Sequence, residues 1–446
     1  MLTESSAAAP TVKGGTAWGE AIVLLLVAPF LLFPTLLLPA TLLALVAISG
    51  LWLRSLFSRA EPPLPLTPVN LSLLLWSLAF LLSVWVSVDP ELTLPKATGL
   101  ILGLSAWRFL VIYQTSPQRL KHGTLFFLLV GLLFTTAGLL GANWLLKEAS
   151  AVPFLDGITR FGTLQELPLI GLDTGIHPNQ IAGAILLYLP LLVALAFTRI
   201  RSARKGWITT ALLAATAATV LALLLTQSRM GWLGAAVGSA ALLLLWLFFQ
   251  PGRRRQLVWV LLAAVGLAAI SGFLLLDIQQ LSQIWIEPPE ETALGSLRTL
   301  SYRQAVWPWS VAALGDFPYT GTGLGAFRNV VQRLYPIAIS ADVDIAHAHN
   351  FLLQVGLDVG VPGLIAYVAL VLSAAAGAWR AAAGAAEVRP LAIGLLAGLI
   401  GFHAYGLADA LALGSKPGLL LWLSLGLLTS LARLRKQDSN AGKTMV

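Results

Sequence analysis

The sequence contains no cysteine and few charged residues, and each shortage narrows the class of protein. Without cysteine there are no disulfide bonds, thiolate metal sites or cysteine nucleophiles, so any catalysis uses other side chains. Charged residues make up 11% of the 446 residues, whereas hydrophobic residues make up 57% and the mean hydropathy is +0.83. A soluble domain does not have this composition. It predicts a polytopic membrane protein.

Hydrophobic runs long enough to cross a bilayer recur along the chain. A bilayer core requires roughly 20 consecutive apolar residues per helix, and short breaks with proline, glycine or charge separate the runs. We expect an all-α fold with about twelve transmembrane helices, near residues 19–34, 36–53, 69–88, 92–113, 122–141, 180–198, 207–225, 230–249, 256–276, 350–377, 390–408 and 417–432. The N-terminal residues do not have the pattern of a cleaved signal peptide, so we expect them to stay attached.

Lysine and arginine collect in alternate loops, which predicts the orientation of the chain. These loops contain Arg54 and Arg59, Arg119 and Lys121, Arg199 to Lys205, Arg253 to Arg255, Arg380 and Arg389, and the C-terminal tail. We expect these loops and both termini on the cytoplasmic side of the membrane. The net charge of +8 is then an anchoring asymmetry and does not indicate nucleic-acid binding.

This orientation divides the chain into three parts. Residues 1–276 hold nine helices and an outer loop at 142–179, residues 277–349 form a long extracytoplasmic loop, and residues 350–446 hold three helices and the basic tail. Loops as long as the second are usually functional or disordered, and its many aromatic residues favour a folded one. We expect Ser296 to cap a short helix that starts at Leu297, with a kink or restart at Pro308.

Arg229, in "TQSRMGW", interrupts otherwise continuous hydrophobic sequence between two predicted spans. An arginine near the bilayer edge can simply extend to the lipid headgroups. The alternative is a phosphate site, because the planar guanidinium suits phosphate oxygens and Thr226, Gln227 and Ser228 offer further donors beside it.

Arg298 and Arg303 lie in the predicted short helix of the long loop. Five residues correspond to about 140° around a helix, so the two side chains cannot both face one ligand. Arg303 shares a face with Trp307, one turn later, and we expect it to be the inward member. Taken alone, either arginine can also be a solvated residue.

The glycines of "PYTGTGLGAF", residues 318–327, do not form a dinucleotide-binding site, because that fingerprint requires a strand before it and a βαβ unit around it. They indicate a tight turn or a close backbone approach to a ligand. The turn is the favoured interpretation, with Gly323 as the glycine that would approach a ligand.

"HAHNFLLQVGLDVG", residues 347–360, places two of the five histidines at the start of a predicted span. Asn350 is expected to cap this helix, which puts His349 at the positive end of the helix dipole. The dipole should lower the pKa of His349 and keep it neutral, as a general base requires. His347 is expected to be a solvated or supporting residue. A polar histidine resting at the lipid headgroups is the alternative for His349.

Two further interpretations concern acids near these histidines. Together with Asp342 and Asp344 the two histidines give no recognised metal-ligand spacing, so we expect no metal site. Gln354 and Asp358 lie one turn apart inside the following span, where an acid is by default functional or paired with a partner.

Together, "TQSRMGW", "YRQAVWPWSVAALGDFPYTGTGLGAF" and "HAHNFLLQVGLDVGVPGLIAYVAL" resemble the signature of the O-antigen ligase and polymerase superfamily, over roughly residues 220 to 375. "GIHPNQIAGAI", residues 175–185, is similar to its outer-loop pattern. One departure is Asp358, where many members have glutamate. The stretch is also similar to a cyanobacterial subgroup once linked to inorganic-carbon uptake.

The resemblance implies a metal-independent and cofactor-independent glycosyltransferase of the GT-C type at the outer face of the bacterial inner membrane. Such enzymes pass a glycan from undecaprenyl diphosphate to lipid A-core, to another glycan or to a protein hydroxyl. The resemblance implies that Arg229 and Arg303 hold the diphosphate and that His349 deprotonates the acceptor. Further substrate-binding candidates are Asn350, Arg298, Arg328, His347, His177, Asn179, Gly323 and Asp358. A bicarbonate-type transporter and a non-catalytic assembly partner are the alternative functions.

Overall fold

The structure is a computed structural model that describes residues 14–57, 64–141, 177–204, 206–275, 298–337, 339 and 345–443. These residues form α-helices and connecting turns, with no strand among them. The all-α class expected from the sequence is therefore confirmed. The predicted cap Ser296 and helix start Leu297, and the acids Asp342 and Asp344, lie outside the described residues.

Every predicted span coincides with a helix. The helices are α1 (Gly14–Leu32), α2 (Leu38–Phe57), α3 (Asn70–Val86), α4 (Pro90–Tyr113), α5 (Pro117–Gly141), α7 (Pro178–Arg201), α8 (Trp207–Leu225), α9 (Arg229–Phe248), α10 (Arg253–Leu275), α12 (Arg298–Asp316), α13 (Phe327–Leu334), α14 (Phe351–Gly384), α15 (Arg389–Tyr405) and α16 (Gly418–Lys443). Within the described residues, seven are long and apolar enough to cross a membrane, and four shorter helices are also apolar. The chain is a multi-pass membrane protein.

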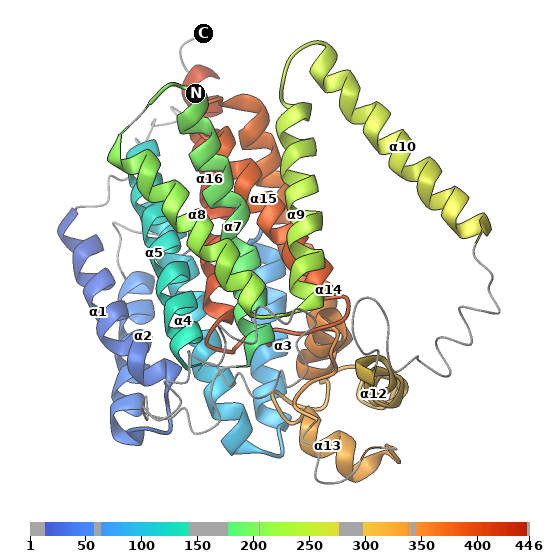
Figure 1. Cartoon of the computed structure of the whole chain (residues 1–446). Helices are drawn as coiled ribbons and strands as arrows, with labels where there is room; N and C mark the ends of the chain where they lie inside the picture. The colour runs from blue at the N-terminus through green and yellow to red at the C-terminus, as the bar shows by residue number, and fades with distance from the viewer. Residues whose placement is uncertain are drawn as a thin grey trace, which may run out of the picture.

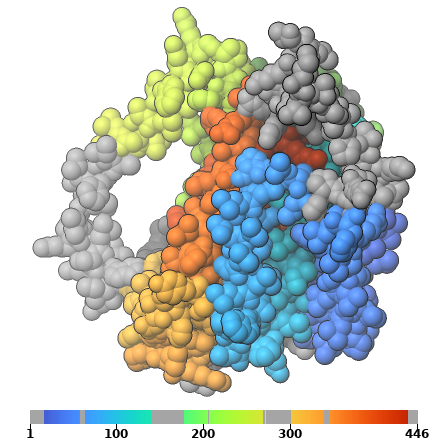
Figure 2. All heavy atoms as spheres, turned by 180° about the vertical axis from the view of Figure 1, so that it is seen from behind, coloured from blue at the N-terminus to red at the C-terminus, as the bar shows by residue number. Residues whose placement is uncertain are grey.

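The membrane helices run side by side as a bundle, whereas α12 and α13 lie across one of its ends (Figure 1). That end, here called the site end, also carries the start of α14 and the loop between α15 and α16. The opposite end, the basic end, carries the arginine-rich connections after α7, α9 and α14. α10 contacts α9 and stands away from the rest of the bundle (Figures 1 and 2). α12 runs through Pro308 as one helix.

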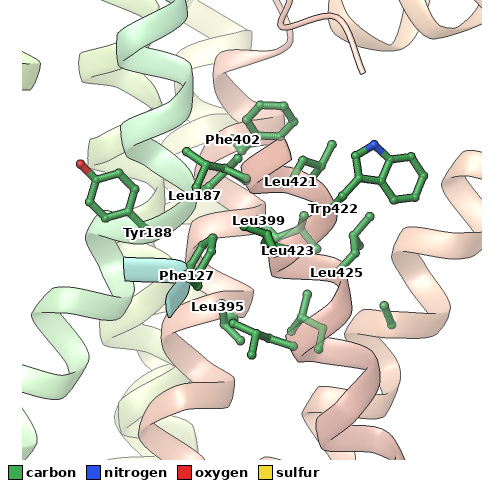
Figure 3. Close-up of a cluster of buried hydrophobic side chains, with 14 of the residues drawn as sticks. Phe127, Leu187, Tyr188, Leu395, Leu399, Phe402, Leu421, Trp422, Leu423 and Leu425 are labelled. Carbon is green, nitrogen blue, oxygen red and sulfur yellow. The ribbon is translucent and has the colours of Figure 1, made fainter. Parts of the chain in front are cut away.

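The centre of the bundle is built from α5, α7, α15 and α16. Figure 3 shows Phe127, Tyr188, Phe402 and Trp422 around a layer of leucines, and these four side chains are fully buried. Small residues let neighbouring helices approach closely, as is usual where lipid surrounds the protein. A Cβ at Gly234 of α9 would lie 2.7 Å from the Gly401 carbonyl oxygen of α15. This packing fixes the site end of α9 beside α7 and α15.

α14 is broken at Gly360, whose φ of 75° is left-handed. Pro362 has no N–H to offer the Asp358 carbonyl, and Val361 donates its N–H to Pro318 at 2.7 Å instead of continuing the helix. A Cβ at Gly360 would lie 2.3 Å from the Tyr319 carbonyl oxygen, so glycine is required there on two grounds. Residues 318 and 319 therefore pack directly against the break in α14.

The glycine-rich turn and Ser83 of α3 donate hydrogen bonds to carbonyls beside this break. Thr322 donates its N–H to the Leu357 carbonyl at 2.7 Å, and the Ser83 hydroxyl donates to the Asp358 carbonyl. A Cβ at Gly323, whose φ is 92°, would lie 2.7 Å from the Cα of Ser87. The close approach of Gly323 is thus to protein backbone, which supports the turn interpretation of these glycines. The turn ties α12 and α13 to α3, α4 and α14.

A buried ion pair closes the bundle near its basic end. Arg108 of α4 pairs with Glu20 of α1, and the Tyr113 hydroxyl donates to the same carboxylate at 2.9 Å. The Arg108 guanidinium also lies 5.1 Å from the ring centre of Trp52. Charges inside a bilayer are costly unless paired, so this cluster joins α1, α2 and α4. It contains no acid or base without a protein partner.

Candidate active site

His349 lies at the start of α14 in a backbone conformation that is uncommon for a residue with a Cβ. Its φ is 49°, and neighbouring hydrogen bonds hold it there. Asn350 caps α14 by accepting from the Leu353 N–H at 3.0 Å, as predicted, and Phe351 donates its N–H to the Gly406 carbonyl at 2.7 Å. Left-handed backbone at such positions persists only where the surroundings enforce it. The start of α14 is therefore clamped against the end of α15.

The residue before His349 is held just as firmly. Ala348 donates its N–H to Gln354 Oε1 at 2.9 Å, and its carbonyl accepts from Trp307 Nε1 at 2.9 Å. Gln354 in turn donates to Asp358 Oδ1 at 3.0 Å. These contacts join α12 and α14 directly below the histidine, and they fix the direction in which its ring points.

Asp409 faces His349 from the loop between α15 and α16. Its Oδ1 lies 3.8 Å from His349 Nδ1, and its Oδ2 accepts from Asn179 Nδ2 at 2.7 Å. The Asp409 side chain is 3% exposed and the His349 side chain 24%. His349 Nδ1 is buried without a hydrogen-bond partner among the described residues. A buried carboxylate beside one ring nitrogen favours the tautomer that leaves the other nitrogen free to accept a proton.

Asn179 and His177 place Asp409 from the first turn of α7. His177 caps this helix through Nδ1, which accepts from the Asn179 N–H at 3.1 Å. The Asn179 carbonyl accepts from the Tyr405 hydroxyl at 2.9 Å. Both sequence-predicted residues thus lie at the site, and their observed contacts are with the acid and its supports.

Arg303 points inward from α12, as the helix phase predicts. Its Nε donates to the Ala408 carbonyl at 2.9 Å and its Nη2 donates to the same oxygen, next to Asp409. Burial lowers the pKa of Arg303, Asp409 opposes this effect and Arg229 adds to it. The electrostatic coupling between Arg303 and Arg229 places both guanidinium groups in one region. The side chain of Arg298 lies outside the described residues.

Arg229 is the first residue of α9, and the loop before it is shaped by its own side chains. The Thr226 hydroxyl donates to the Leu223 carbonyl at 2.6 Å, and Ser228 Oγ accepts from the Gly231 N–H at 3.1 Å as the N-cap. Thr226 and Ser228 are both buried. The Thr226 hydroxyl is therefore used within the turn and Ser228 Oγ accepts within the cap, while donation from this loop to a ligand stays a prediction. The guanidinium itself stays on the site end.

His347 is not the solvated residue that the sequence allowed. Its ring lies 4.1 Å from that of His349, centre to centre, and its Nδ1 accepts from the His349 N–H at 3.2 Å. It therefore supports the left-handed backbone of His349, in agreement with the expected supporting role. Its side chain is half-buried.

Both histidines are held neutral at physiological pH. Burial lowers the pKa of His349 to about 3, His347 acts in the same direction, and Asp409 opposes the shift. Burial also lowers the pKa of His347 to about 3, with contributions from Lys96, His177, Arg303 and Arg328. The neutral state of His349 agrees with the sequence prediction, although its first cause is burial and not the helix dipole.

Two further basic side chains, Arg328 and Lys96, lie near His347 at the candidate active site. Arg328 stands in the first turn of α13, and Lys96 of α4 lies 4.0 Å from Asp358 Oδ1. With Arg229 and Arg303 they give this end of the bundle four basic side chains around two neutral histidines. Such a field attracts a strongly anionic ligand.

Asp358 belongs to the support of the site and not to its centre. Its Oδ1 accepts from Gln354 and from the Gly325 N–H at 3.2 Å, and its side chain is 5% exposed. It follows His349 by nine residues, which is about 13 Å along a helix. The acid has protein partners, as expected, and they come from α14 itself, from the glycine-rich turn and from Lys96 of α4.

Three ligand-type atoms of His347, His349 and Asp409 lie within 4.8 Å of one another, a grouping that can hold a metal ion. The grouping differs from the one considered in the sequence, because Asp409 takes the place of Asp342 and Asp344. His347 Nδ1 is already an acceptor for the His349 N–H, and the basic side chains around the group disfavour a cation.

Sequence reasoning missed Asp409, which lies 3.8 Å from His349 Nδ1. The signal was weak: one acid in "GLADALALG", between two spans whose ends were uncertain by a few residues. The tertiary fold alone brings this loop to the start of α14, 60 residues away in the chain. Tyr302 was also missed, and its ring packs edge-on against His349 at 5.1 Å.

Residues 214–368 match the family model described as O-antigen ligase. This is about a third of the chain, from α8 to the middle of α14, and it contains Arg229, Arg303 and His349 but neither Asn179 nor Asp409. A search of curated proteins found no match. The match confirms the resemblance to the O-antigen ligase superfamily.

Proposed function

We propose that the protein is a membrane glycosyltransferase that moves a glycan from undecaprenyl diphosphate to an acceptor hydroxyl at the outer face of the bacterial inner membrane. The observation that carries the proposal is the juxtaposition of neutral His349 with buried Asp409 beside Arg303 and Arg229. The family match supports a lipid-linked glycan and an acceptor as substrates. The basic loops support a site end that faces outward.

The proposed reaction needs a base and a place for negative charge. His349 removes the proton from the acceptor hydroxyl, the acceptor oxygen forms the new glycosidic bond, and the bond from the sugar to the diphosphate breaks. Asp409 stabilises the imidazolium that forms. Arg229 and Arg303 stabilise the charge that builds on the diphosphate leaving group, and groups fixed for this purpose make a large catalytic contribution. Arg328 and Lys96 extend the same field.

The reaction so written requires neither metal nor cofactor. The diphosphate is already a good leaving group, and two guanidinium groups supply the positive charge that a divalent ion would supply elsewhere. We therefore expect turnover to survive chelation. Complete loss of transfer in EDTA with restoration by one divalent metal would assign His347, His349 and Asp409 to that metal instead.

A transporter would need polar groups of the membrane interior that stay open to a substrate. Asp358 and Arg108 are the residues to consider for such a site. Asp358 accepts from Gln354 and Gly325, and Arg108 pairs with Glu20. Their contacts favour a structural role, so transport is the weaker proposal.

The direct experiment combines the purified chain, a polyprenyl diphosphate-linked glycan and candidate acceptors. We expect polyprenyl diphosphate to be released only when an acceptor is present. Lipid A-core, a polysaccharide and a protein serve as the acceptor arms, and the arm that responds identifies the acceptor class. Bicarbonate uptake by proteoliposomes that contain only this chain, without any glycan transfer, would overturn the proposal.

One prediction separates the two arginines of α12. We expect Arg303→Lys to lower kcat/KM on the order of 10²-fold. The ammonium group of lysine cannot bind the Ala408 carbonyl as the planar guanidinium does and also offer further donors to the diphosphate. Arg298→Lys is the matched control and should be mild, since Arg298 lies about 140° away on the helix. Glycan-transfer rates and donor affinity test both variants. Equal tolerance at the two positions would show that Arg303 does not contact the donor.

A second prediction concerns pH. Because the pKa of His349 is lowered from 6.5 to about 3, the neutral base persists as the pH falls below 6.5 and is lost only near the lowered value. We therefore expect kcat/KM, which reports the free enzyme, to show no acid limb between about pH 8 and pH 5. Circular dichroism at each pH confirms that the protein is still folded. An acid limb centred near 6.5 would mean that His349 is solvated in the free enzyme.

A further inference from the structure

A cavity lies at the basic end of the bundle, far from the candidate active site. It has a volume of about 540 Å³ and lies between α7, α9 and α15, which pack together (Figure 1). We call it the basic-end cavity. Small-molecule sites fall in the same range of size. Nothing in the proposed transfer reaction uses it.

The walls of the basic-end cavity are apolar over about two helical turns. Leu242 and Trp246 of α9 form one wall and Ile393 of α15 another. On α7 the cavity extends from Val193 to Arg201, eight residues or about 12 Å. Such a depth accepts a hydrocarbon chain lying along the helices.

The cavity is open on its lipid-facing side. Val193, Phe197 and Leu243 line it, and they are 37%, 44% and 52% exposed. These residues belong to helices that cross the membrane by length and composition. A ligand therefore enters from the bilayer, which favours a lipid over a soluble molecule.

The rim carries two arginines and neutral donors. The Arg201 guanidinium lies 5.3 Å from the ring centre of Trp246, which holds it over the wall of the cavity. Arg389 donates from Nε to the Ala382 carbonyl at 2.9 Å and lies 5.6 Å from the ring centre of Phe249. Both guanidinium groups retain N–H donors for an anion, because each has five.

Among the residues that the structure describes, no acidic side chain lines the basic-end cavity, so its rim is positive. Thr198, Ser202 and Gln250 add hydrogen-bond donors beside the two arginines. An apolar slot below a positive rim matches a molecule with a hydrocarbon chain and an anionic headgroup. Basic residues at the membrane surface favour anionic lipids in the same way.

We infer that the basic-end cavity binds an anionic phospholipid, with one acyl chain along α7 and α9 and its phosphate between Arg201 and Arg389. The bound lipid would fill the space between three helices that also carry the candidate active site at their other ends. It would therefore stabilise the bundle when it binds.

The test measures lipid binding to the delipidated full chain in detergent, by native mass spectrometry and by the shift in Tm. The probes are phosphatidylglycerol and phosphatidylcholine with the same acyl chains, and inorganic phosphate. We expect phosphatidylglycerol to bind roughly 25-fold tighter than phosphatidylcholine, about fivefold for each arginine. Inorganic phosphate should give no comparable shift, because it cannot use the apolar walls.

Three variants locate the site. Arg201→Gln should weaken phosphatidylglycerol binding about fivefold and leave phosphatidylcholine unchanged. Arg255→Gln is the matched control, since Arg255 also lies over an aromatic ring, that of Phe248, but does not line the cavity. Ser239→Phe fills the slot from a lipid-exposed position and should weaken both lipids. Size-exclusion profiles confirm that each variant is folded.

Three outcomes would overturn the proposal. Equal binding of the two phospholipids would show that the rim does not select charge. Equal losses from Arg201→Gln and Arg255→Gln would show diffuse attraction without a site. Stabilisation by inorganic phosphate alone would make the rim a site for soluble anions.

Discussion

Replacing His349 with alanine is expected to abolish glycan transfer and to leave donor binding largely intact. The diphosphate is held mainly by Arg229 and Arg303 in our proposal, so its affinity does not depend on the imidazole. A general base contributes on the order of 10²–10⁴ in rate. Transfer under saturating donor, together with equilibrium binding of labelled donor, separates the two effects.

Two controls sharpen this test. His347→Ala should cost less, because His347 supports the backbone of His349 through one hydrogen bond but lies behind it. Added imidazole should partly restore the His349→Ala variant, since it supplies the missing base, and should do nothing for the arginine variants. Near-normal turnover of His349→Ala would make the base assignment wrong.

Replacing Asp409 with asparagine is expected to have the second largest effect. Asparagine preserves the shape and can still contact Asn179, but it removes the negative charge 3.8 Å from His349 Nδ1. The imidazolium that forms during proton transfer then loses its counter-ion, and the ring loses the group that selects its tautomer. We expect a loss of about 10²-fold or more in kcat with little change in donor affinity.

Asp358→Asn provides the contrast for this variant. Asp358 is also a buried acid of the bundle, yet its partners are Gln354 and the Gly325 N–H. We expect it to lower Tm and to leave the pH profile of the remaining activity unchanged. If Asp409→Asn also lowered Tm and left both kcat and the pH profile unchanged, Asp409 would be a structural residue only.

Local patterns predicted the helices and several details of the site. Hydrophobic runs of membrane length predicted the position of a helix in all twelve cases, because each run satisfies its own backbone hydrogen bonds within one helix. The cap at Asn350 and the inward face of Arg303 were also predictable, since both depend on spacing within a single helix. The fold class followed from these features.

Contacts between distant segments were not predictable from the same patterns. Asp409 is held near His349 by two hydrogen bonds between distant segments: Phe351 donates its N–H to the Gly406 carbonyl, and Asn179 donates to the Asp409 carboxylate. Three separate parts of the chain therefore have to meet. The glycine-rich turn, residues 318–327, packs against the break of α14 at Gly360. Neither segment reveals this contact when its sequence is read alone. The Thr226 hydroxyl before Arg229 donates within its own turn, which the sequence also did not reveal.

Single-turnover transfer is the most direct test of the central claim that His349, Arg229 and Arg303 form a glycan-transfer site. Full-length protein is loaded with labelled polyprenyl diphosphate-linked glycan, and acceptor is then added to wild type and to His349→Ala. We predict that wild type converts the loaded glycan to product with release of polyprenyl diphosphate, and that His349→Ala retains the donor unconverted. Conversion by both proteins at the same rate, or by neither after donor has bound, would contradict the account.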